Sequence, residues 1–124
     1  MNYLGKFNDI FQDMLHELVN VFPKDSELRL YDFGLRSVLA ADEKVACNIF
    51  HNQVAVPFEK QIKERDEQFF MNKSYDEYDG DGYQGVTDVI TKLKNCWREL
   101  SNDNKDIIWK YLQILLTLSM KINS

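Results

Sequence analysis

The chain has 124 residues, of which 44% are hydrophobic and 28% charged, which fits one globular domain and excludes a disordered chain. Fifteen basic residues stand against twenty acidic ones, and the net charge of −5 argues against a surface that binds duplex nucleic acid. Two prolines and five glycines are too few turn residues for an all-β sandwich, so we expect a single all-α domain over residues 1–124.

Hydrophobic residues at helical spacing predict two helices in the first third of the chain. The first covers residues 4–22 and ends before Pro23, because a proline disfavours the α conformation in the residue that precedes it. The second begins at Asp25 or Ser26, either of which can cap a helix. The two apolar stripes consist of Phe7, Ile10, Phe11, Met14, Leu15, Leu18 and Phe22, and of Leu28, Tyr31, Leu35 and Val38.

A short third helix and a longer fourth helix follow. Asp42 can cap the third, whose apolar side chains are Val45, Ala46, Ile49 and Phe50. Pro57 suits the first position of the fourth, which we expect to extend to about Met71. Its surface alternates acids and lysines at spacings of four residues, a pattern typical of a solvated helix face.

The second half is predicted to hold one long loop and two helices. An acidic, glycine-rich loop covers about 72–85, and a helix runs from about Val86 to Leu100. Ser101 caps a last helix, Asn102–Ile122, which is apolar on more than one face and is therefore either surrounded by other helices or covered by a partner. The expected fold is an irregular bundle of five to six helices.

The acidic loop resembles a calcium-binding loop of the EF-hand type. Such a loop needs oxygen ligands at positions 1, 3, 5 and 12, glycine at position 6 and a carbonyl at position 7. Gly82 falls on position 6, and the candidate ligands are Glu77, Asp79, Asp81, Tyr83 and Asp88. We therefore consider Ca²⁺ the one candidate cofactor.

Four departures weaken this match. Glu77 is longer than the usual first ligand, and Asp88 is too short for the bidentate contact at the last position. Gln84 replaces the aliphatic residue that pairs two such loops, and no second loop is present. An acidic turn without a metal explains the same residues, because Asp and Gly favour turns in their own right.

No catalytic motif is present. The two histidines, His16 and His51, belong to different predicted helices, and the sequence has no P-loop, H-E-x-x-H or C-x-x-C. Cys47 and Cys96 both fall on apolar faces, which favours reduced thiols over a disulfide. Without a catalytic motif, we expect a non-enzymatic protein. Without a signal-peptide pattern, we expect it to be intracellular, in the cytoplasm or nucleus, and not secreted.

Two kinds of partner remain. Phe69, Phe70, Trp109 and Tyr111 place bulky rings on more than one helix face, so they are candidates for a protein partner or self-association; filling the core is the alternative. The cations between Lys92 and Lys110 offer only a weak nucleic-acid contact. The longest apolar-rich stretch is too short to span a membrane, which takes about 20 residues.

Three stretches carry a family resemblance: FNDIFQDMLHELVNVFP near the start, FHNQVAVPFEKQIKERDEQFF at residues 50–70 and LSNDNKDIIWKYLQIL at residues 100–115. They resemble small uncharacterised helical proteins encoded by large DNA viruses of algae and protists. The resemblance implies an intracellular viral or virion-associated setting, and it implies no reaction. The expected function is therefore a protein–protein interaction or structural module.

Overall fold

The computed structural model describes residues 2–72 and 91–123, and within these ranges every regular element is a helix. This confirms the all-α prediction. The elements are α1 (Tyr3–Val21), α2 (Ser26–Ala41), α3 (Val45–Phe50), a π-helical turn (His51–Ala55), α4 (Val56–Glu64), α5 (Glu67–Asn72), a helical segment at 91–96, a 3₁₀ turn (Trp97–Glu99) and α7 (Asn102–Ile122).

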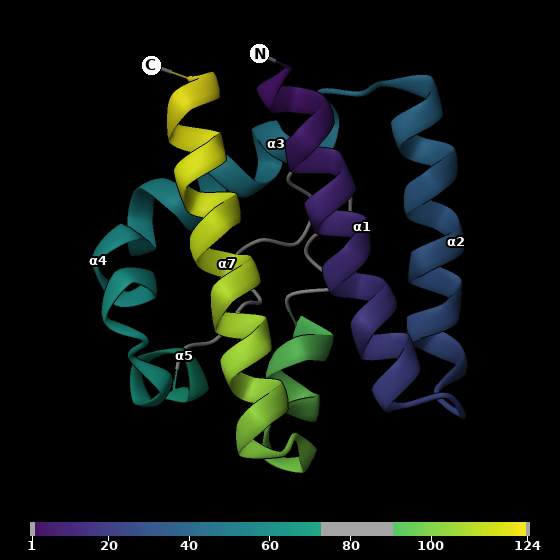
Figure 1. Ribbon diagram of the computed structural model, residues 1–124, viewed down its shortest axis with the longest axis vertical. Coiled ribbons are helices and arrows are strands. Elements are labelled where there is room, and N and C mark those ends of the chain that lie inside the picture. Colours follow the sequence, from purple (N-terminus) through teal and green to yellow (C-terminus); the bar gives the residue numbers. More distant parts are fainter. Residues whose placement is uncertain (1, 73–90, 124) are drawn as a thin grey trace.

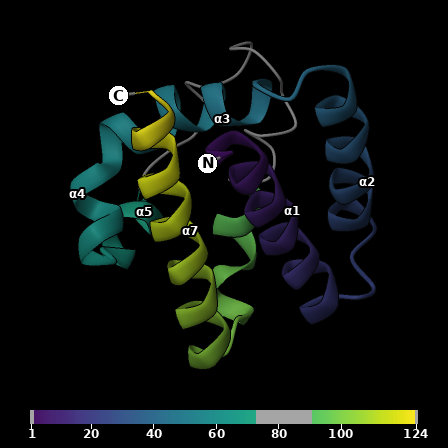
Figure 2. The ribbon, with the colours of Figure 1, turned by 45° about the horizontal axis from the view of Figure 1, so that its top comes forward.

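Helices α1 and α7 lie side by side in the middle of the bundle and run in opposite directions (Figures 1 and 2). The ammonium of Lys121, at the end of α7, lies 5.3 Å from the ring centroid of Tyr3, at the start of α1. Helix α2 packs on the far side of α1, and α4 packs on the far side of α7. The outer surface of α2 therefore forms one edge of the bundle of described helices.

The predicted stripe of the first helix forms the centre of the core. Phe7, Phe11, Leu15 and Leu18 are each at most 1% exposed. They meet Phe50 of α3 and the inward face of α7, and the rings of Phe7 and Phe50 contact edge to face at 5.5 Å. Burying one such side chain stabilises the fold by roughly 1.5–3 kcal/mol, so this stripe fixes α1 between its neighbours.

The predicted caps of α2 and α7 are confirmed. The Asp25 carboxylate accepts the backbone N–H groups of Glu27 and Leu28, at 3.1 and 3.2 Å. Ser101 Oγ accepts the N–H of Asn104 at 3.1 Å. Each cap satisfies N–H groups that have no partner inside their own helix, which sets where the helix begins.

The predicted break between the third and fourth helices is wrong. From Val45 to Glu64 the chain stays helical, because a π-helical turn bridges the two, and in it the Val56 N–H donates to the His51 carbonyl five residues back. Pro57 lies in the first turn of α4, as predicted, and Phe58 departs from helical geometry at φ −121° and ψ 20°. The wider π turn and this kink accommodate the proline ring, which a regular α-helix would not.

The predicted fourth helix is also too long. It ends at Glu64, because Arg65 adopts a left-handed conformation with φ 53° and ψ 49°. A new short helix, α5, starts at Glu67, and the Asp66 carboxylate accepts the N–H of Phe69 at 3.1 Å at its start. No glycine or proline announces this turn, which is why hydrophobic spacing alone missed it.

Helix α7 has the predicted bounds but is not surrounded by the described elements. Its inward residues Ile108, Leu115 and Leu116 are at most 2% exposed, whereas Lys110, Ile114, Thr117 and Lys121 form an exposed stripe along its outer side. Within the described ranges, no helix combines the length and the apolar content that a membrane span requires.

Candidate functional site

The candidate calcium ligands Glu77, Asp79, Asp81, Tyr83 and Asp88 lie outside the described residues. The same holds for most of the predicted loop at 72–85, of which only Asn72 is described, as the last residue of α5. Among residues 2–72 and 91–123, no three His, Cys, Asp or Glu side chains gather closely enough to hold a metal ion. Calcium binding at 77–88 stays a prediction. A comparison of the melting temperature with and without a calcium chelator tests it.

Three of the four aromatic candidates, Phe69, Phe70 and Trp109, gather where α4, α5 and α7 meet. The fourth, Tyr111, is not in this cluster, and its hydroxyl is influenced by Glu17 and Asp13 of α1. Phe58 contacts the rings of Phe69 and Phe70 at centroid distances of 5.6 and 5.7 Å. Phe70 contacts Trp109 at 5.9 Å, and Trp109 contacts Trp97 at 5.5 Å. Trp109 is buried at 7% exposure, while Phe69, Phe70 and Tyr111 are half-buried.

This aromatic cluster holds the short helix α5 against the bundle. Aromatic pairs at these distances contribute about 0.5–1.5 kcal/mol each beyond the area they bury. Contacts within the chain thus cover much of the Phe69 and Phe70 rings. More exposed apolar side chains are found on other helices of the described part.

Most of the cations in the 92–110 region take part in ion pairs within the chain. Lys92 Nζ lies 2.8 Å from the Asp25 carboxylate, and this partner raises the pKa of Lys92. Lys105 pairs with Glu67 at 3.3 Å and lies over the Trp97 ring, and Lys110 pairs with Asp106 at 3.1 Å. Lys92 and Lys105 tie α2 and α5 to neighbouring segments, whereas the Lys110 pair lies within α7. These pairs leave less net positive charge for a nucleic-acid contact.

The two histidines contact partners on different sides of the bundle. His16 Nδ1 lies 3.5 Å from the Asp32 carboxylate on α2. His51 Nδ1 lies 3.4 Å from Ser119 Oγ, but Ser119 is fully buried and its hydroxyl donates to the Leu116 carbonyl. A nucleophile must reach its substrate, so this pair favours a role in joining the π-helical turn to α7.

Both cysteines are buried and reduced. Burial raises the pKa of the Cys47 thiol to about 11 and also raises that of Cys96. A thiol with a raised pKa is a poor nucleophile at neutral pH, so neither cysteine has the electrostatic environment of a catalytic or redox-active one.

A small apolar cavity of about 70 Å³ lies where α1, α4, α5 and α7 meet. Phe11, Phe58, Met71, Trp97 and Trp109 are among its lining residues. The indole N–H of Trp97 is buried and has no hydrogen-bond partner among the described residues. A cavity that holds a benzene ring measures about 150 Å³, so this one is too small for a substrate of that size. It is a gap in the packing at the junction of several helices.

Among residues 2–72 and 91–123, the two most exposed large apolar side chains are on the outer surface of α2. Leu30 and Phe33 are 67% and 70% exposed, whereas Val56 on α4 and Ile114 on α7 are 57% and 41% exposed and stand alone on their helices. Leu30 and Phe33 are three residues apart, so they occupy neighbouring positions on one helix face.

Our sequence reasoning missed this pair, although the sequence contains a signal for it. The predicted core stripe of α2 uses Leu28, Tyr31, Leu35 and Val38, and Leu30 and Phe33 fall off that stripe. Of the stripe, Leu28 and Leu35 are buried at 0% and 2% exposure. Bulky apolar residues that remain after one helix face is assigned to the core mark a second apolar face.

Comparison with protein-family models, with curated proteins and with solved structures found no match to this chain.

Proposed function

We propose that this protein is a non-enzymatic interaction module that binds a protein partner through the outer surface of α2. The observation that carries the proposal is the exposure of Leu30 and Phe33, at 67% and 70%, side by side on a helix at the edge of the bundle. Single exposed apolar residues are common on any protein, but adjacent bulky ones mark binding surfaces more often.

The polar groups of the described residues support a binding role over a catalytic one. The Ser119 hydroxyl beside His51 is enclosed, both thiols have raised pKa values, and the cavity is small and apolar. By contrast, Leu30 and Phe33 contribute little to the core of their own chain. A partner that covers Leu30 and Phe33 would account for two bulky apolar side chains at the surface.

Affinity capture with matched variants tests the proposal. Wild-type protein, Leu30→Ser/Phe33→Ser and the control Val56→Ser are each immobilised, and the bound proteins are quantified by mass spectrometry. Val56 is also exposed but lies on α4. We expect the wild type and Val56→Ser to capture the same proteins, and the double variant to lose them. Equal capture by all three would contradict a role for α2.

The setting of such an interaction rests on the sequence alone. The resemblance to helical proteins of large DNA viruses supports an intracellular or virion-associated partner. Virion components among the captured proteins would support the virion-associated setting, and their absence would count against it.

A further inference from the structure

The outer face of α2 is uncharged along its whole length. We use the name "α2 outer face" for the exposed stripe formed by Ser26, Leu30, Phe33, Ser37 and Ala40. These positions follow one another at spacings of four, three, four and three residues, which is the seam along which one helix packs against another. Among the described elements, α2 packs against α1 and α3, and all five residues of this face are exposed.

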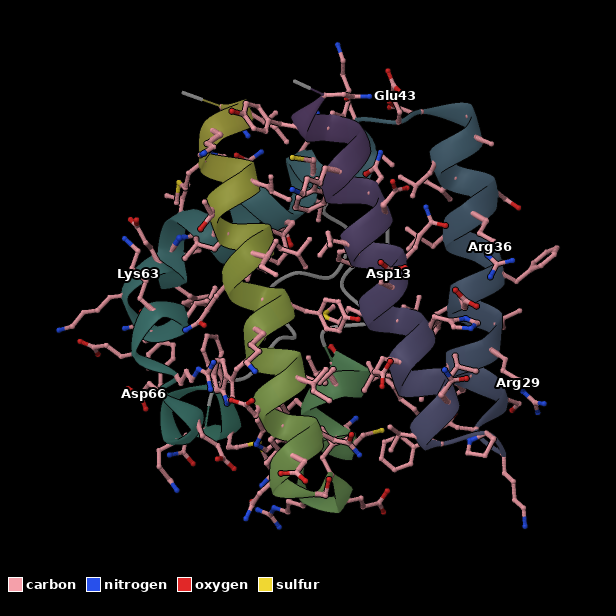
Figure 3. All side chains as sticks on the ribbon, viewed as in Figure 1. Asp13, Arg29, Arg36, Glu43, Lys63 and Asp66 are labelled. Atoms are coloured by element: carbon pink, nitrogen blue, oxygen red, sulfur yellow. The ribbon has the colours of Figure 1, made fainter. Side chains whose placement is uncertain are left out.

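Positive charge borders this face. Arg29 and Arg36 are exposed and lie seven residues apart, so they stand two turns apart on the same side of the stripe. Figure 3 shows both on the outermost helix, with Arg29 reaching away from the rest of the molecule. Between Leu28 and Ala41 the one carboxylate is Asp32, which is 8% exposed.

Neither guanidinium is saturated by contacts within the described part of the chain. Arg36 uses one nitrogen, Nη2, for a 3.4 Å contact with Asp32, and its side chain is 59% exposed. Arg29 is exposed and takes part in none of the ion pairs between described residues. A guanidinium offers five N–H donors, so both arginines can bind a carboxylate supplied from outside.

The size of the face favours a single helix over a second copy of the chain. With 16 residues, α2 is about 24 Å long, and a strip about 10 Å wide gives roughly 240 Å². A stable dimer of two copies would bury about 800 Å² on each, more than this face supplies, whereas a weak, transient contact with one helix can be smaller. In an antiparallel pair of α2 helices, the arginines of both copies would also lie along the same border and repel.

We propose that the α2 outer face binds an amphipathic helix of another protein, whose apolar stripe is bordered by carboxylates two turns apart. This inference rests on the proposed function and names the class of its partner. Leu30 and Phe33 pack against the partner's stripe, and Ser37 and Ala40 are small enough for the partner's larger side chains to lie over them. Arg29 and Arg36 bind the two carboxylates, which fixes the direction and register of the partner helix.

Selection from a displayed library of helices tests this. Each library member has a fixed apolar stripe, and its border positions are randomised. Members that bind the full-length wild-type protein, and fail to bind Leu30→Ser/Phe33→Ser, are sequenced. We expect enrichment of Asp and Glu at border positions seven residues apart. The affinity of selected helices should fall about thirtyfold or more in the double variant, since two central apolar contacts are lost.

Charge reversal gives the matched control. Arg29→Glu/Arg36→Glu should weaken the selected acidic helices by about three- to tenfold, and raising the salt concentration should weaken wild-type binding in the same direction. Selection against this variant should enrich Lys and Arg at the same border positions. Arg29→Glu alone keeps the Arg36–Asp32 contact and should show part of the effect. Thermal melting checks that every variant folds.

The outcomes separate the inference from the proposed function. Helices that require Leu30 and Phe33 but show no acidic preference would overturn the partner class and leave α2 as the binding surface. Failure to select any helix that distinguishes wild type from Leu30→Ser/Phe33→Ser would contradict both. Two further results would overturn the inference. One is a wild-type dimer in sedimentation that Leu30→Ser/Phe33→Ser abolishes. The other is wild-type binding to vesicles of phosphatidylcholine and phosphatidylserine that the same double variant abolishes.

Discussion

Asp25 joins two distant parts of the chain at the start of α2. One side of its carboxylate caps the helix by accepting the N–H groups of Glu27 and Leu28, and the other binds Lys92 Nζ at 2.8 Å. The Lys92 hydrogen bond is the main cause that lowers the pKa of Asp25, and the helix N–H groups lower it further against the opposing effect of burial. The capping role is visible in the sequence, but the ion pair depends on the fold.

This arrangement predicts a pH-dependent contribution to stability. Asp25 has a lowered pKa, so its contribution is present above about pH 4 and is lost as the pH falls through the folded-state pKa. Lys92 has a raised pKa, so its contribution is lost only as the pH rises above about 10.5. The pair therefore stabilises the fold between these limits.

Asp25→Asn separates the two roles, because Asn still caps a helix but carries no charge. At pH 7 we expect the free energy of unfolding to fall by about 0.5–1 kcal/mol, and Asp25→Ala to cost about 1 kcal/mol more. Urea titrations at pH 7 and at pH 2.5 measure this, and the Asn variant should approach wild type at the lower pH. An equal loss of unfolding free energy at both pH values would exclude the ion pair as its cause. Asp9→Asn, which changes an exposed acid on α1, is the control.

Burial of the thiols predicts slow alkylation. A pKa raised from 9.0 to about 11 lowers the thiolate fraction of Cys47 by about a hundredfold at neutral pH, and burial at 1% exposure also blocks access. In the native protein at pH 8, Cys47 and Cys96 should react with a thiol reagent at least a hundredfold more slowly than in urea. Rapid reaction without denaturant would show that the core around α3 opens readily.

At the scale of the elements, the turn between α4 and α5 depends on side chains from α7. Gln113 Nε2 donates to the carbonyls of Ile62 and Lys63 at 3.2 and 3.3 Å, which satisfies acceptors at the end of α4. Arg65, the left-handed residue, donates to the carboxylate of Asp106 at 2.6 Å and to Gln113 Oε1 at 3.3 Å. The Arg65 bond is the main cause that lowers the pKa of Asp106.

Gln113→Ala should therefore destabilise the protein although it removes no core side chain. The Lys63 carbonyl loses the Gln113 donor, and the Ile62 carbonyl keeps only the Arg65 N–H. We therefore expect a cost of about 1–2 kcal/mol in the free energy of unfolding, measured by urea titration. Thr117→Ala, one turn further along α7, removes a hydroxyl that bonds within its own helix and should cost less than about 0.5 kcal/mol. Equal effects of the two substitutions would mean that the Gln113 contacts do not hold the turn.

At the scale of the whole molecule, α2 presents one apolar face to the bundle and another to the outside. Leu28 is fully buried and Leu30, two residues later, is 67% exposed. Leu28→Ala should cost about 2–5 kcal/mol because it leaves a cavity in the core, whereas Leu30→Ala should change stability by less than about 0.5 kcal/mol. Chemical denaturation of the two variants measures the contrast. A large loss from Leu30→Ala would show that this face serves the fold of its own chain and would weaken the proposed function.

Hydrophobic spacing predicted the bounds of α1 and α7 and the start of α2 closely, because each helix has a strong apolar stripe and a capping residue that act within the helix itself. It failed at the π-helical turn, His51–Ala55, and at the turn between α4 and α5. There, the π-helical turn accommodates Pro57, and contacts from α7 stabilise the left-handed Arg65; neither leaves a local mark in the sequence. The exposed pair on α2 could have been recognised as apolar residues left over from the core stripe, but the sequence alone could not show that no described helix covers them.

The sequence by itself determined that this protein is an all-α bundle, since helix periodicity, capping and the shortage of turn residues are local properties. It also determined which residues could fill the core. Only the tertiary structure decided which apolar residues remain outside, because burial depends on the partners that other helices supply. It placed Phe69, Phe70 and Trp109 among neighbouring rings, paired Lys92 with Asp25, and left Leu30 and Phe33 on the edge of the bundle.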